Sequence, residues 1–308
     1  MDKEILPTPT TETIKIVRNE YGLTDSNISK SVDIIHKWLT QQPHLPDETD
    51  NGRLERWLLR CKNSIETTKR TLDMYYALKG LVPEIMYHWD TKSEWFSIAS
   101  KLFFEIPLPT LTPDRDRVLI LGLQTPDTRH FDPVMMYRIT LMILEIRMME
   151  DYCRSDVIIL DFNNYSLAHL PHVSLPRVKK YEMCIMRAYK VRIKAVHMLN
   201  VPPFAEHLIS LFKSILKTKL ASRIQVHSGD MAKFYKQVPK EILPAEYGGE
   251  AGSVLHLWGS WVKKLECYQN WFLKHQELKS DEKKRPGKMI TSTDLFGFEG
   301  SFRKLDVD

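Results

Sequence analysis

The run Val157-Ile-Ile-Leu-Asp-Phe162 decides how the middle of this chain folds. It is one of four short aliphatic runs, and stretches with helical spacing of apolar residues separate these runs. Strands joined through helices of that length need crossover connections, so the pattern predicts an α/β fold with a mostly parallel sheet. The four runs are Val118–Leu123, Val157–Phe162, Val191–Leu199 and Ile224–Val226, and the helical stretches between them cover about Pro133–Asp151, Ser174–Ala188 and Pro203–Lys217.

The first hundred residues have a different pattern, with helices separated by Pro and Gly. One apolar stripe begins at Ile28 after a Ser26 cap, a second at Leu54 and a third at Ile65. After the α/β region, one more amphipathic helix is expected over about Val254–His275, and the aromatic stretch from Leu295 to Phe302 is expected to pack back on the body. We therefore expect three parts: a helical domain over 1–100, an α/β domain over 101–275 and a tail over 276–308.

Length and composition are those of an ordinary globular protein, with 308 residues, 43% hydrophobic and 27% charged. The start of the chain has no apolar signal core, and no apolar run approaches the roughly 18 residues needed to cross a bilayer. The four cysteines are far apart and form no CxxC pair, which argues against a zinc site and a disulfide framework. The expected location is cytoplasmic, with any membrane contact peripheral and reversible.

Charge is unevenly distributed along the chain. Between Ser174 and Lys236 there are 13 Lys and Arg against 3 Asp and Glu, an excess of +10 in a molecule of net charge +5. Within that stretch, an apolar helical stripe follows Pro202 and Pro203. Basic residues beside an amphipathic apolar helix suit an anionic membrane surface. The simpler alternative, a crossover helix that packs on the sheet, stays open. The stripe consists of Phe204, Leu208, Leu211, Phe212, Ile215 and Leu216.

Within the same stretch, Arg192 and Lys194 alternate with aliphatic residues, so they are expected to project from one face of a strand. Lys219 and Arg223 are four residues apart and would share one side of a helical turn. Such a cluster can bind a phosphate group, although scattered solvated charge is the alternative. The Asp114-Arg-Asp116 segment is interpreted as a solvated turn.

Sequence signatures of chemistry are missing. There is no GxGxxG or GxxxxGK[ST] loop, no GxSxG elbow, and His169 and His172 form the nearest thing to a metal pair without a third ligand. The chain also has no recognisable nucleic-acid-binding signature. We therefore expect no catalytic residues, no metal, no cofactor and no nucleic-acid partner.

Four stretches give the sequence a resemblance to a known family. They are Arg56-Trp-Leu-Leu-Arg-Cys-Lys62, Ile158-Ile-Leu-Asp-Phe162, Val191 through Asn200, and Leu243-Pro-Ala-Glu-Tyr-Gly-Gly249, of which the last is the most specific. On these residues the chain resembles the CRAL-TRIO lipid-binding family, in its α-tocopherol transfer protein-like branch. The similarity extends from about residue 25 to 275, and Gly300-Ser-Phe-Arg-Lys-Leu305 is similar to tails of insect-type members.

The resemblance implies a three-helix N-terminal domain followed by a lipid-binding domain with an apolar cavity and a gating helix over Val201–Leu216. It implies phosphoinositide-binding positions at Lys62, Arg192, Lys194, Lys219 and Arg223. Leu144 stands where the tocopherol-binding branch has a small hydroxyl residue, which removes one polar contact to a ligand head. The implied cavity positions are Tyr137, Thr140, Leu144, Leu160, Val173, Tyr181, Cys184 and Ile185, joined by Phe204, Leu208, Leu211 and Phe212 of the gating helix.

Together these features predict a non-catalytic intracellular carrier of one hydrophobic small molecule that exchanges its cargo at phosphoinositide-containing membranes. Tocopherols, retinoids, carotenoids and related lipids all remain open as cargo, and a monomer is favoured. The alternative hypothesis is a scaffold or signalling module that holds a lipid and recruits a protein partner.

Overall fold

The computed structural model describes residues 4–48, 50–205, 209, 213, 218–227 and 231–297, with the side chain of Lys219 excepted. Most of the expected gating helix, including Leu208, Leu211 and Phe212, therefore lies outside the described residues, as does the tail from 298 onward. Among the helices that are described, none is both long enough and apolar enough to cross a bilayer.

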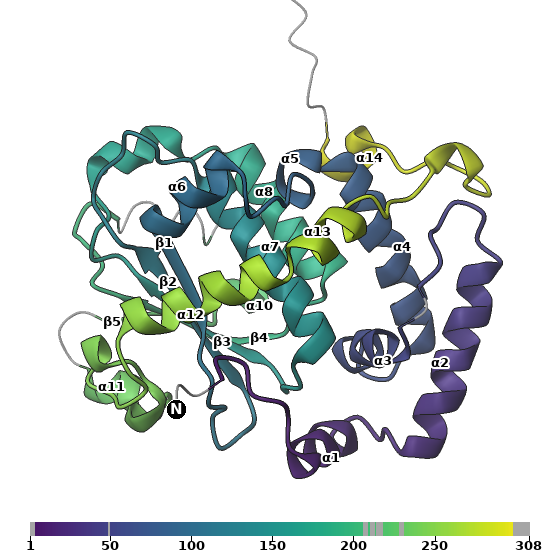
Figure 1. Cartoon of the computed structure of the whole chain (residues 1–308), viewed down its shortest axis with the longest axis horizontal. Helices are drawn as coiled ribbons and strands as arrows, with labels where there is room; N and C mark the ends of the chain where they lie inside the picture. The colour runs from purple at the N-terminus through teal and green to yellow at the C-terminus, as the bar shows by residue number, and fades with distance from the viewer. Residues whose placement is uncertain are drawn as a thin grey trace, which may run out of the picture.

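Helices form the N-terminal part, which lies beside the α/β part (Figure 1). Helix α2 begins after a Thr24 capping box, in which the Thr24 and Asn27 side chains each accept from the other residue's backbone N–H. Trp57 of α3 and Tyr76 of α4 are fully buried in the core between these helices. The helices are α1 (Thr11–Asn19), α2 (Asp25–Thr40), α3 (Asn51–Arg60), α4 (Ile65–Leu81), α5 (Pro83–Met86) and α6 (Glu94–Leu102).

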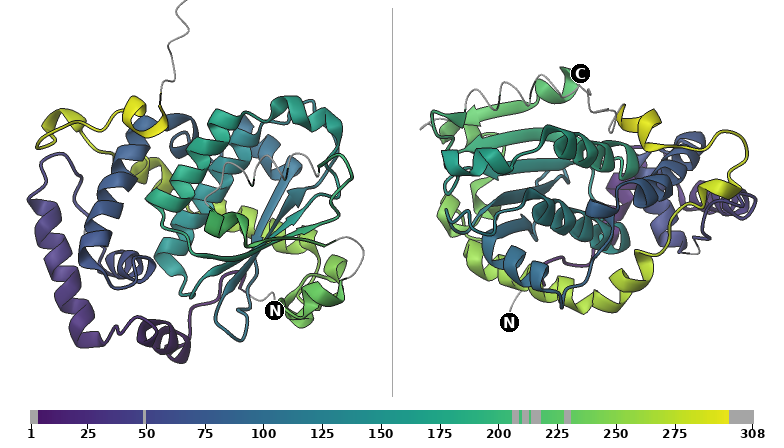
Figure 2. Two further views of the ribbon diagram at one scale, coloured as in Figure 1. Left: turned by 180° about the vertical axis from the view of Figure 1, so that it is seen from behind. Right: turned by 90° about the horizontal axis from the view of Figure 1, so that it is seen from above.

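A five-stranded sheet forms the centre of the second part, with the strands in the order β1-β2-β3-β4-β5. Strand β1 pairs antiparallel with β2, and the remaining neighbours pair parallel. The mixed α/β fold with a mostly parallel sheet is therefore confirmed, and Figure 2 shows the strands stacked side by side. The strands are β1 (Phe103–Pro107), β2 (Arg117–Leu123), β3 (Asp156–Asp161), β4 (Ile193–Leu199) and β5 (Ile224–His227).

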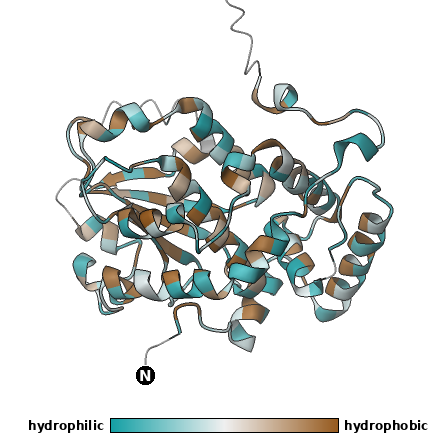
Figure 3. Ribbon diagram, turned by 45° about the horizontal axis from the view of Figure 1, so that its top comes forward, coloured by the Kyte–Doolittle hydropathy of each residue, from teal (hydrophilic) through white to brown (hydrophobic). Residues whose placement is uncertain are grey.

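The crossover connections are helical. Helix α7 (Pro133–Glu150) joins β2 to β3, and α8 (Leu175–Met183), extended by a π-helical turn over Cys184–Ala188, lies between β3 and β4. Hydrophobic residues concentrate on the strands (Figure 3). The shorter elements are a 3₁₀ turn over Leu167–His172, α10 (Thr218–Ala221), α11 (Ala232–Tyr235), 3₁₀ turns over Lys240–Ile242, Ala245–Tyr247 and Glu282–Lys284, and α14 (Ser292–Phe296).

Two C-terminal helices, α12 (Val254–Cys267) and α13 (Gln269–His275), cross the front of the molecule in Figure 1. The single long helix expected here is wrong in detail, because the helix breaks at Tyr268. The Trp261 indole N–H donates to the carbonyl of Pro107 at 3.0 Å, which fixes α12 against β1. Beyond α13, Phe296 is buried, and Lys179 Nζ donates to its carbonyl.

The motif Leu243–Gly249 has a clear backbone reason for its two glycines. Gly248 has φ +75°, a left-handed conformation that ends a 3₁₀ turn. At Gly249 a Cβ atom would lie 2.0 Å from the Leu243 carbonyl oxygen, so no other residue fits without backbone movement. The Tyr247 hydroxyl donates to Asp161 at the end of β3, which ties the motif to the sheet.

Candidate functional site

One face of the sheet carries the first component of the site. Glu105 on β1 pairs in register with Leu121 on β2, Leu121 with Leu160 on β3, and Leu160 with Met198 on β4. Paired residues of neighbouring strands point to the same side, so these four side chains form a row across one face. Helix α7 covers this face at its β1 end, because Thr140 of α7 contacts Glu105.

Toward β5 the same face is less buried. Ile158 and Leu160 on β3 and Ile224 on β5 are only half-buried, and Val226 is 44% exposed. The opposite face is packed more tightly, since Ile106, Ile120 and Ile159 are all fully buried there. Apolar side chains left partly exposed near the middle of a sheet are unusual in an ordinary core and are suited to contact with an apolar ligand.

The predicted cavity residues on helices converge beside this face. Tyr137, Thr140 and Leu144 are spaced three and four residues apart and lie on one side of α7, where all three are buried. The ring of Tyr137 stacks on that of Tyr181 of α8, with centroids 4.2 Å apart and planes 13° apart. Cys184 and Ile185 follow in the π-helical turn and are buried.

The structure thus brings Tyr137 of α7 and Tyr181 of α8 together, and it places Leu160 of β3 in the cross-strand row that ends at Glu105 beside α7. Two further predicted residues, Val173 after the 3₁₀ turn and Phe204 after β4, are half-buried. The structure gives no position for Leu208, Leu211 or Phe212. The expected lining, on the helix and sheet sides as on its gating side, stays a prediction.

Glu105 is the polar residue that the sequence analysis missed. Its side chain is 1% exposed, and its Oε2 is hydrogen bonded to the Thr140 hydroxyl at 2.5 Å. Within the part of the chain that the structure describes, no donor reaches its other oxygen, Oε1. Burial raises the pKa of Glu105 to about 8, against smaller lowering effects from Thr140 and the Arg147 charge.

One signal for this residue was present in the sequence. A carboxylate stands in the middle of the aliphatic run Phe103-Phe-Glu-Ile-Pro107, where alternation places it on the same side as Phe103. The proline and the charged residue break the apolar pattern from which a strand would be predicted. A charged residue within such a run is rarely buried without a partner, which makes it a functional candidate.

Three of the predicted phosphoinositide residues lie at the amino ends of β4 and β5, on one edge of the sheet. Strand β4 begins only at Ile193, and a register shift opposite Asp156 and Val157 makes Lys194 the extra residue of a bulge. Arg192 therefore precedes the strand. The alternation expected for this segment is still seen in its burial, since Arg192 and Lys194 are more exposed than Ile193 between them. Arg223 immediately precedes β5 and donates through Nη1 to the carbonyl of Ile193.

The five predicted phosphoinositide-binding residues differ in how strongly their side chains are engaged by other residues of the protein. Lys194 Nζ lies 2.7 Å from Asp114 and 2.6 Å from Asp116, and Asp116 is fully buried. The solvated turn expected at Asp114–Asp116 is therefore wrong for Asp116, which also accepts from Ser155 and Arg154. Lys194 is the most strongly engaged member of the set.

Arg192 and Lys62 are less engaged. The guanidinium of Arg192 lies over the Tyr21 ring at 4.4 Å, and its Nη1 has no hydrogen-bond partner among the described residues. The backbone carbonyl of Tyr21 accepts from Asn63, the neighbour of the exposed Lys62. Tyr21 thus connects the regions of Lys62 and Arg192. Lys219 lies on α10, and its side chain is outside the description.

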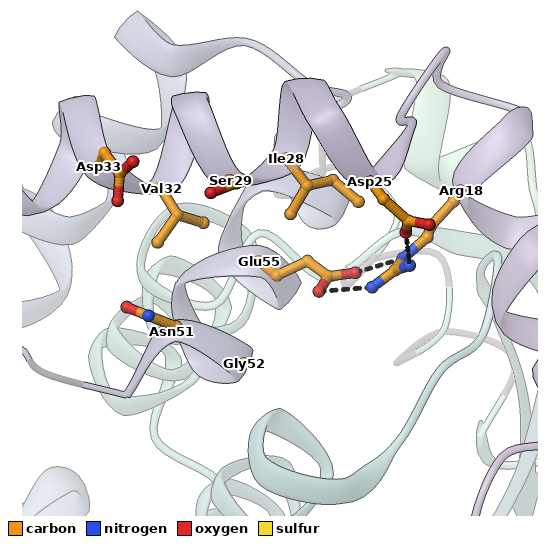
Figure 4. A pocket seen from close by; sticks show the side chains of 9 residues that line it. All are labelled: Arg18, Asp25, Ile28, Ser29, Val32, Asp33, Asn51, Gly52 and Glu55. Atoms are coloured by element: carbon orange, nitrogen blue, oxygen red, sulfur yellow. Dashed lines mark hydrogen bonds and ion pairs between the residues drawn. The ribbon is translucent and has the colours of Figure 1, made fainter.

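A pocket in the N-terminal helices has a different character (Figure 4). Arg18 enters it and pairs with Asp25 and Glu55, each at 2.7 Å. Polar residues of α2 and α3 and the apolar Ile28 and Val32 of α2 complete its walls. Charges that already neutralise one another offer little to an apolar ligand, so this pocket is not the candidate site.

Comparisons with known proteins give two family matches. The CRAL/TRIO domain family matches residues 106–249, and the Pinta-like UBA domain family matches residues 24–96. The chain is 26% identical over 224 residues to the human alpha-tocopherol transfer protein-like protein, covering 72% of this chain. The chain spans only 64% of the length of that relative.

Human clavesin-2 is 21% identical over 258 residues, which cover 82% of this chain and 78% of clavesin-2. Among solved structures, that of Sfh5 aligns with a TM-score of 0.46 at 10% identity, covering 86% of this chain and 100% of Sfh5. A similarity at that level carries no argument about function.

Proposed function

Since the chain belongs to the CRAL/TRIO family, we propose that it is a non-catalytic carrier of one hydrophobic molecule, which it exchanges at phosphoinositide-containing membranes. The observation that carries this proposal is the half-exposed apolar part of the sheet face beside α7 and α8. The names of its relatives, a tocopherol transfer-like protein and the clavesins, support a lipid cargo.

The cargo would lie between that face and the two crossover helices. Ile158, Leu160 and Ile224 would form the floor, and the stacked Tyr137 and Tyr181 rings one wall. Burying a long hydrocarbon there is favourable by about 25 cal/mol for each Å² of apolar surface removed from water. The segment that follows Pro202 and Pro203 would act as the gate, with Phe204 as its first apolar contact.

Docking would depend on the edge that carries Arg192, Lys194 and Arg223. Arg192 is the strongest candidate for a phosphate contact, because its guanidinium lies over the Tyr21 ring and its Nη1 has no hydrogen-bond partner among the described residues. Nη1 is buried, so the side chain would have to turn outward to reach a phosphate. Lys194 would first have to leave both the exposed Asp114 and the buried Asp116, so it is a weaker candidate than Arg192. We propose a reversible, peripheral association of a cytoplasmic protein with the membrane.

Membrane binding and release of cargo would be coupled through affinity. A phosphoinositide shifts the protein toward an open form only if it binds that form more tightly than the closed one. The docking edge and the gate are close in sequence, since β4 runs from Ile193 to Leu199 and leads directly into Pro202. A ligand at one end of β4 can therefore bias the segment at its other end.

The experiment is cargo transfer between vesicles with and without phosphatidylinositol bisphosphate. Mass spectrometry of the purified protein first identifies the bound lipid. We expect phosphoinositide in the acceptor vesicles to accelerate transfer, and Arg192→Ala to weaken vesicle binding about fivefold, as loss of roughly 1 kcal/mol implies. Arg129→Ala is the matched control, because Arg129 is 81% exposed and follows β2 at the other end of the sheet.

Equal transfer by the wild type and Arg192→Ala, with no dependence on phosphoinositide, would remove the docking part of the proposal. The absence of any lipid, bound or exchangeable, would remove the carrier itself. A lipid that stays bound while a protein partner associates stoichiometrically would favour the scaffold hypothesis.

A further inference from the structure

We propose that Glu105 recognises the head of the cargo, with its Oε1 accepting a hydrogen bond from a hydroxyl group, so that the protein selects apolar alcohols and phenols. This inference rests on the proposed carrier function and adds a specificity-determining residue to it.

The first step is the position of Glu105. It stands in the same cross-strand row as Leu160, one of the half-buried apolar residues of the candidate site. Its side chain faces Thr140 on α7, which lies one turn from Tyr137 in the wall of stacked rings. Glu105 thus places a carboxyl group at the end of an otherwise apolar surface.

The second step is the unpartnered oxygen. A buried polar atom without a hydrogen bond costs about 1–3 kcal/mol, so native interiors contain few of them. Oε1 of Glu105 is such an atom among the described residues, and its side chain is almost completely buried. A ligand group that hydrogen bonds to Oε1 would recover that cost, and binding would then be coupled to the chemistry of the head group.

The third step concerns the protons. The Thr140 hydroxyl lies 3.1 Å from the carbonyl of Met136, which can only accept, so the single hydroxyl proton is engaged there. The contact of Thr140 with Oε2 then needs a proton from the carboxyl group. Burial keeps Glu105 protonated at neutral pH, since its pKa is raised to about 8. With the proton on Oε2, Oε1 is left as a carbonyl-type acceptor.

That arrangement discriminates between head groups. An alcohol or phenol donates to Oε1, whereas an ether, an aldehyde or a hydrocarbon has no proton to give. An anionic head is disfavoured as well, because the charge would be buried beside a carboxyl group without a cation. Among the described residues no Lys or Arg forms an ion pair with Glu105; Arg147 acts on it only through a longer-range charge effect.

The test measures the preference for an alcohol over its own methyl ether. Three matched pairs are titrated by displacement of a hydrophobic fluorophore: octadecanol, retinol and α-tocopherol, each against its methyl ether. We expect the wild type to bind the alcohol of at least one pair about fivefold more tightly than the ether, the value of one hydrogen bond. Glu105→Leu should abolish this preference and leave ether affinity unchanged.

Two further variants separate recognition from a structural role. Glu105→Gln keeps an acceptor oxygen and should retain most of the preference, whereas a purely structural residue would show no such rescue. Ile120→Val alters a fully buried residue of β2 on the opposite face of the sheet and should keep the full preference.

Equal binding of alcohol and ether by the wild type, or an unchanged preference in Glu105→Leu, overturns the inference while the carrier function stands. Failure of every probe to bind a protein that also carries no lipid overturns both. The melting temperature of each variant confirms that it is folded, so a loss of preference cannot be confused with unfolding.

Discussion

Two buried carboxyl groups, one on each side of α7, have opposite electrostatic environments. Glu145, on α7 itself, faces the N-terminal helices and is surrounded by Arg53 at 2.7 Å and by the hydroxyls of Tyr75 and Tyr189. Glu105, across from α7 on β1, has Thr140 as its hydrogen-bond partner. Both are buried, yet cationic neighbours hold the pKa of Glu145 well below its usual range although burial opposes this, and burial raises that of Glu105 to about 8.

This difference distinguishes a buried carboxylate that stabilises helix packing from a buried carboxyl group that is available to a ligand. An ion-paired network joins α3, α4, α7 and α13, since Arg53 pairs with Glu145 and also contacts Glu48 and His275. Such a network fixes how the helices pack. Glu105 has no ion pair among the described residues and joins no such network, so its retention in the interior is better explained by a ligand.

The largest effect expected from this comparison is a dependence of stability on pH. The pKa of Glu105 is higher in the folded state than in the unfolded one, so its contribution is fully present below about pH 4.5 and is lost as the pH rises toward 8. The stability of the wild type minus that of Glu105→Gln should therefore fall by about 5 kcal/mol over this range. Urea unfolding at a series of pH values measures this difference.

Taking the difference in stability between wild type and Glu105→Gln cancels the contributions of other titrating groups. Examples are Lys79 and His275, whose pKa values are lowered to about 7 and about 4. A difference that stays flat with pH would mean that Glu105 is ionised in the folded protein, in which case the contrast with Glu145 disappears.

Removing the cation beside Glu145 should have the next largest effect. Arg53→Met keeps much of the side-chain volume but leaves two buried carboxylates, Glu145 and Glu48, without their ion pair. The expected loss is about 4 kcal/mol in the free energy of unfolding. Guanidinium unfolding at pH 7 measures it, with Arg129→Met as an exposed control that should change stability by less than about 0.5 kcal/mol. A loss as small as that of the control would contradict the structural role.

A smaller effect is expected for one hydrogen bond to Glu145. Tyr189→Phe removes the hydroxyl that donates to Oε1 at 2.6 Å and leaves the ring packing intact. Hydrogen bonds to a charged group are worth about 1.5–3 kcal/mol, so we expect a loss of about 2 kcal/mol in thermal or chemical unfolding. If the loss is below 0.5 kcal/mol, Arg53 and Tyr75 alone satisfy the carboxylate.

The smallest effect is expected on the Glu105 side. Thr140→Val removes the hydroxyl that contacts Oε2 and should cost about 1 kcal/mol, since the carboxyl stays neutral at pH 7. A loss larger than that of Tyr189→Phe would reverse the proposed order of the two sites.

The sequence was sufficient for the strands β2 to β5 and for the crossover helices α7 and α8, because aliphatic runs and helical periodicity are local signals. It placed the first helix cap at Ser26, whereas the structure caps α2 at Thr24, two residues earlier. Strand β1 escaped prediction, since a charge and a proline interrupt its five residues. Pairing with β2 stabilises it, and that contact is invisible in a local pattern.

For the site, the resemblance predicted the α7 and α8 residues, and the structure stacks one of each, Tyr137 and Tyr181, on each other. Two features depended on tertiary contacts instead. The ion pairs of Lys194 come from Asp114 and Asp116, about eighty residues earlier in the chain. The free oxygen of Glu105 depends on which groups fail to reach it, and no spacing rule reports that.

The contact of Trp261 with Pro107 has a consequence for colloidal behaviour. Strand β1 is at the border of the sheet, and exposed borders recruit strands from other molecules. Pro107 at the end of β1 has no backbone N–H to donate. Its carbonyl accepts a hydrogen bond from the indole N–H of Trp261 on α12. Helix α12 therefore protects the edge strand β1 from pairing with strands of other molecules. If α12 detaches from β1, the protein should form β-rich aggregates.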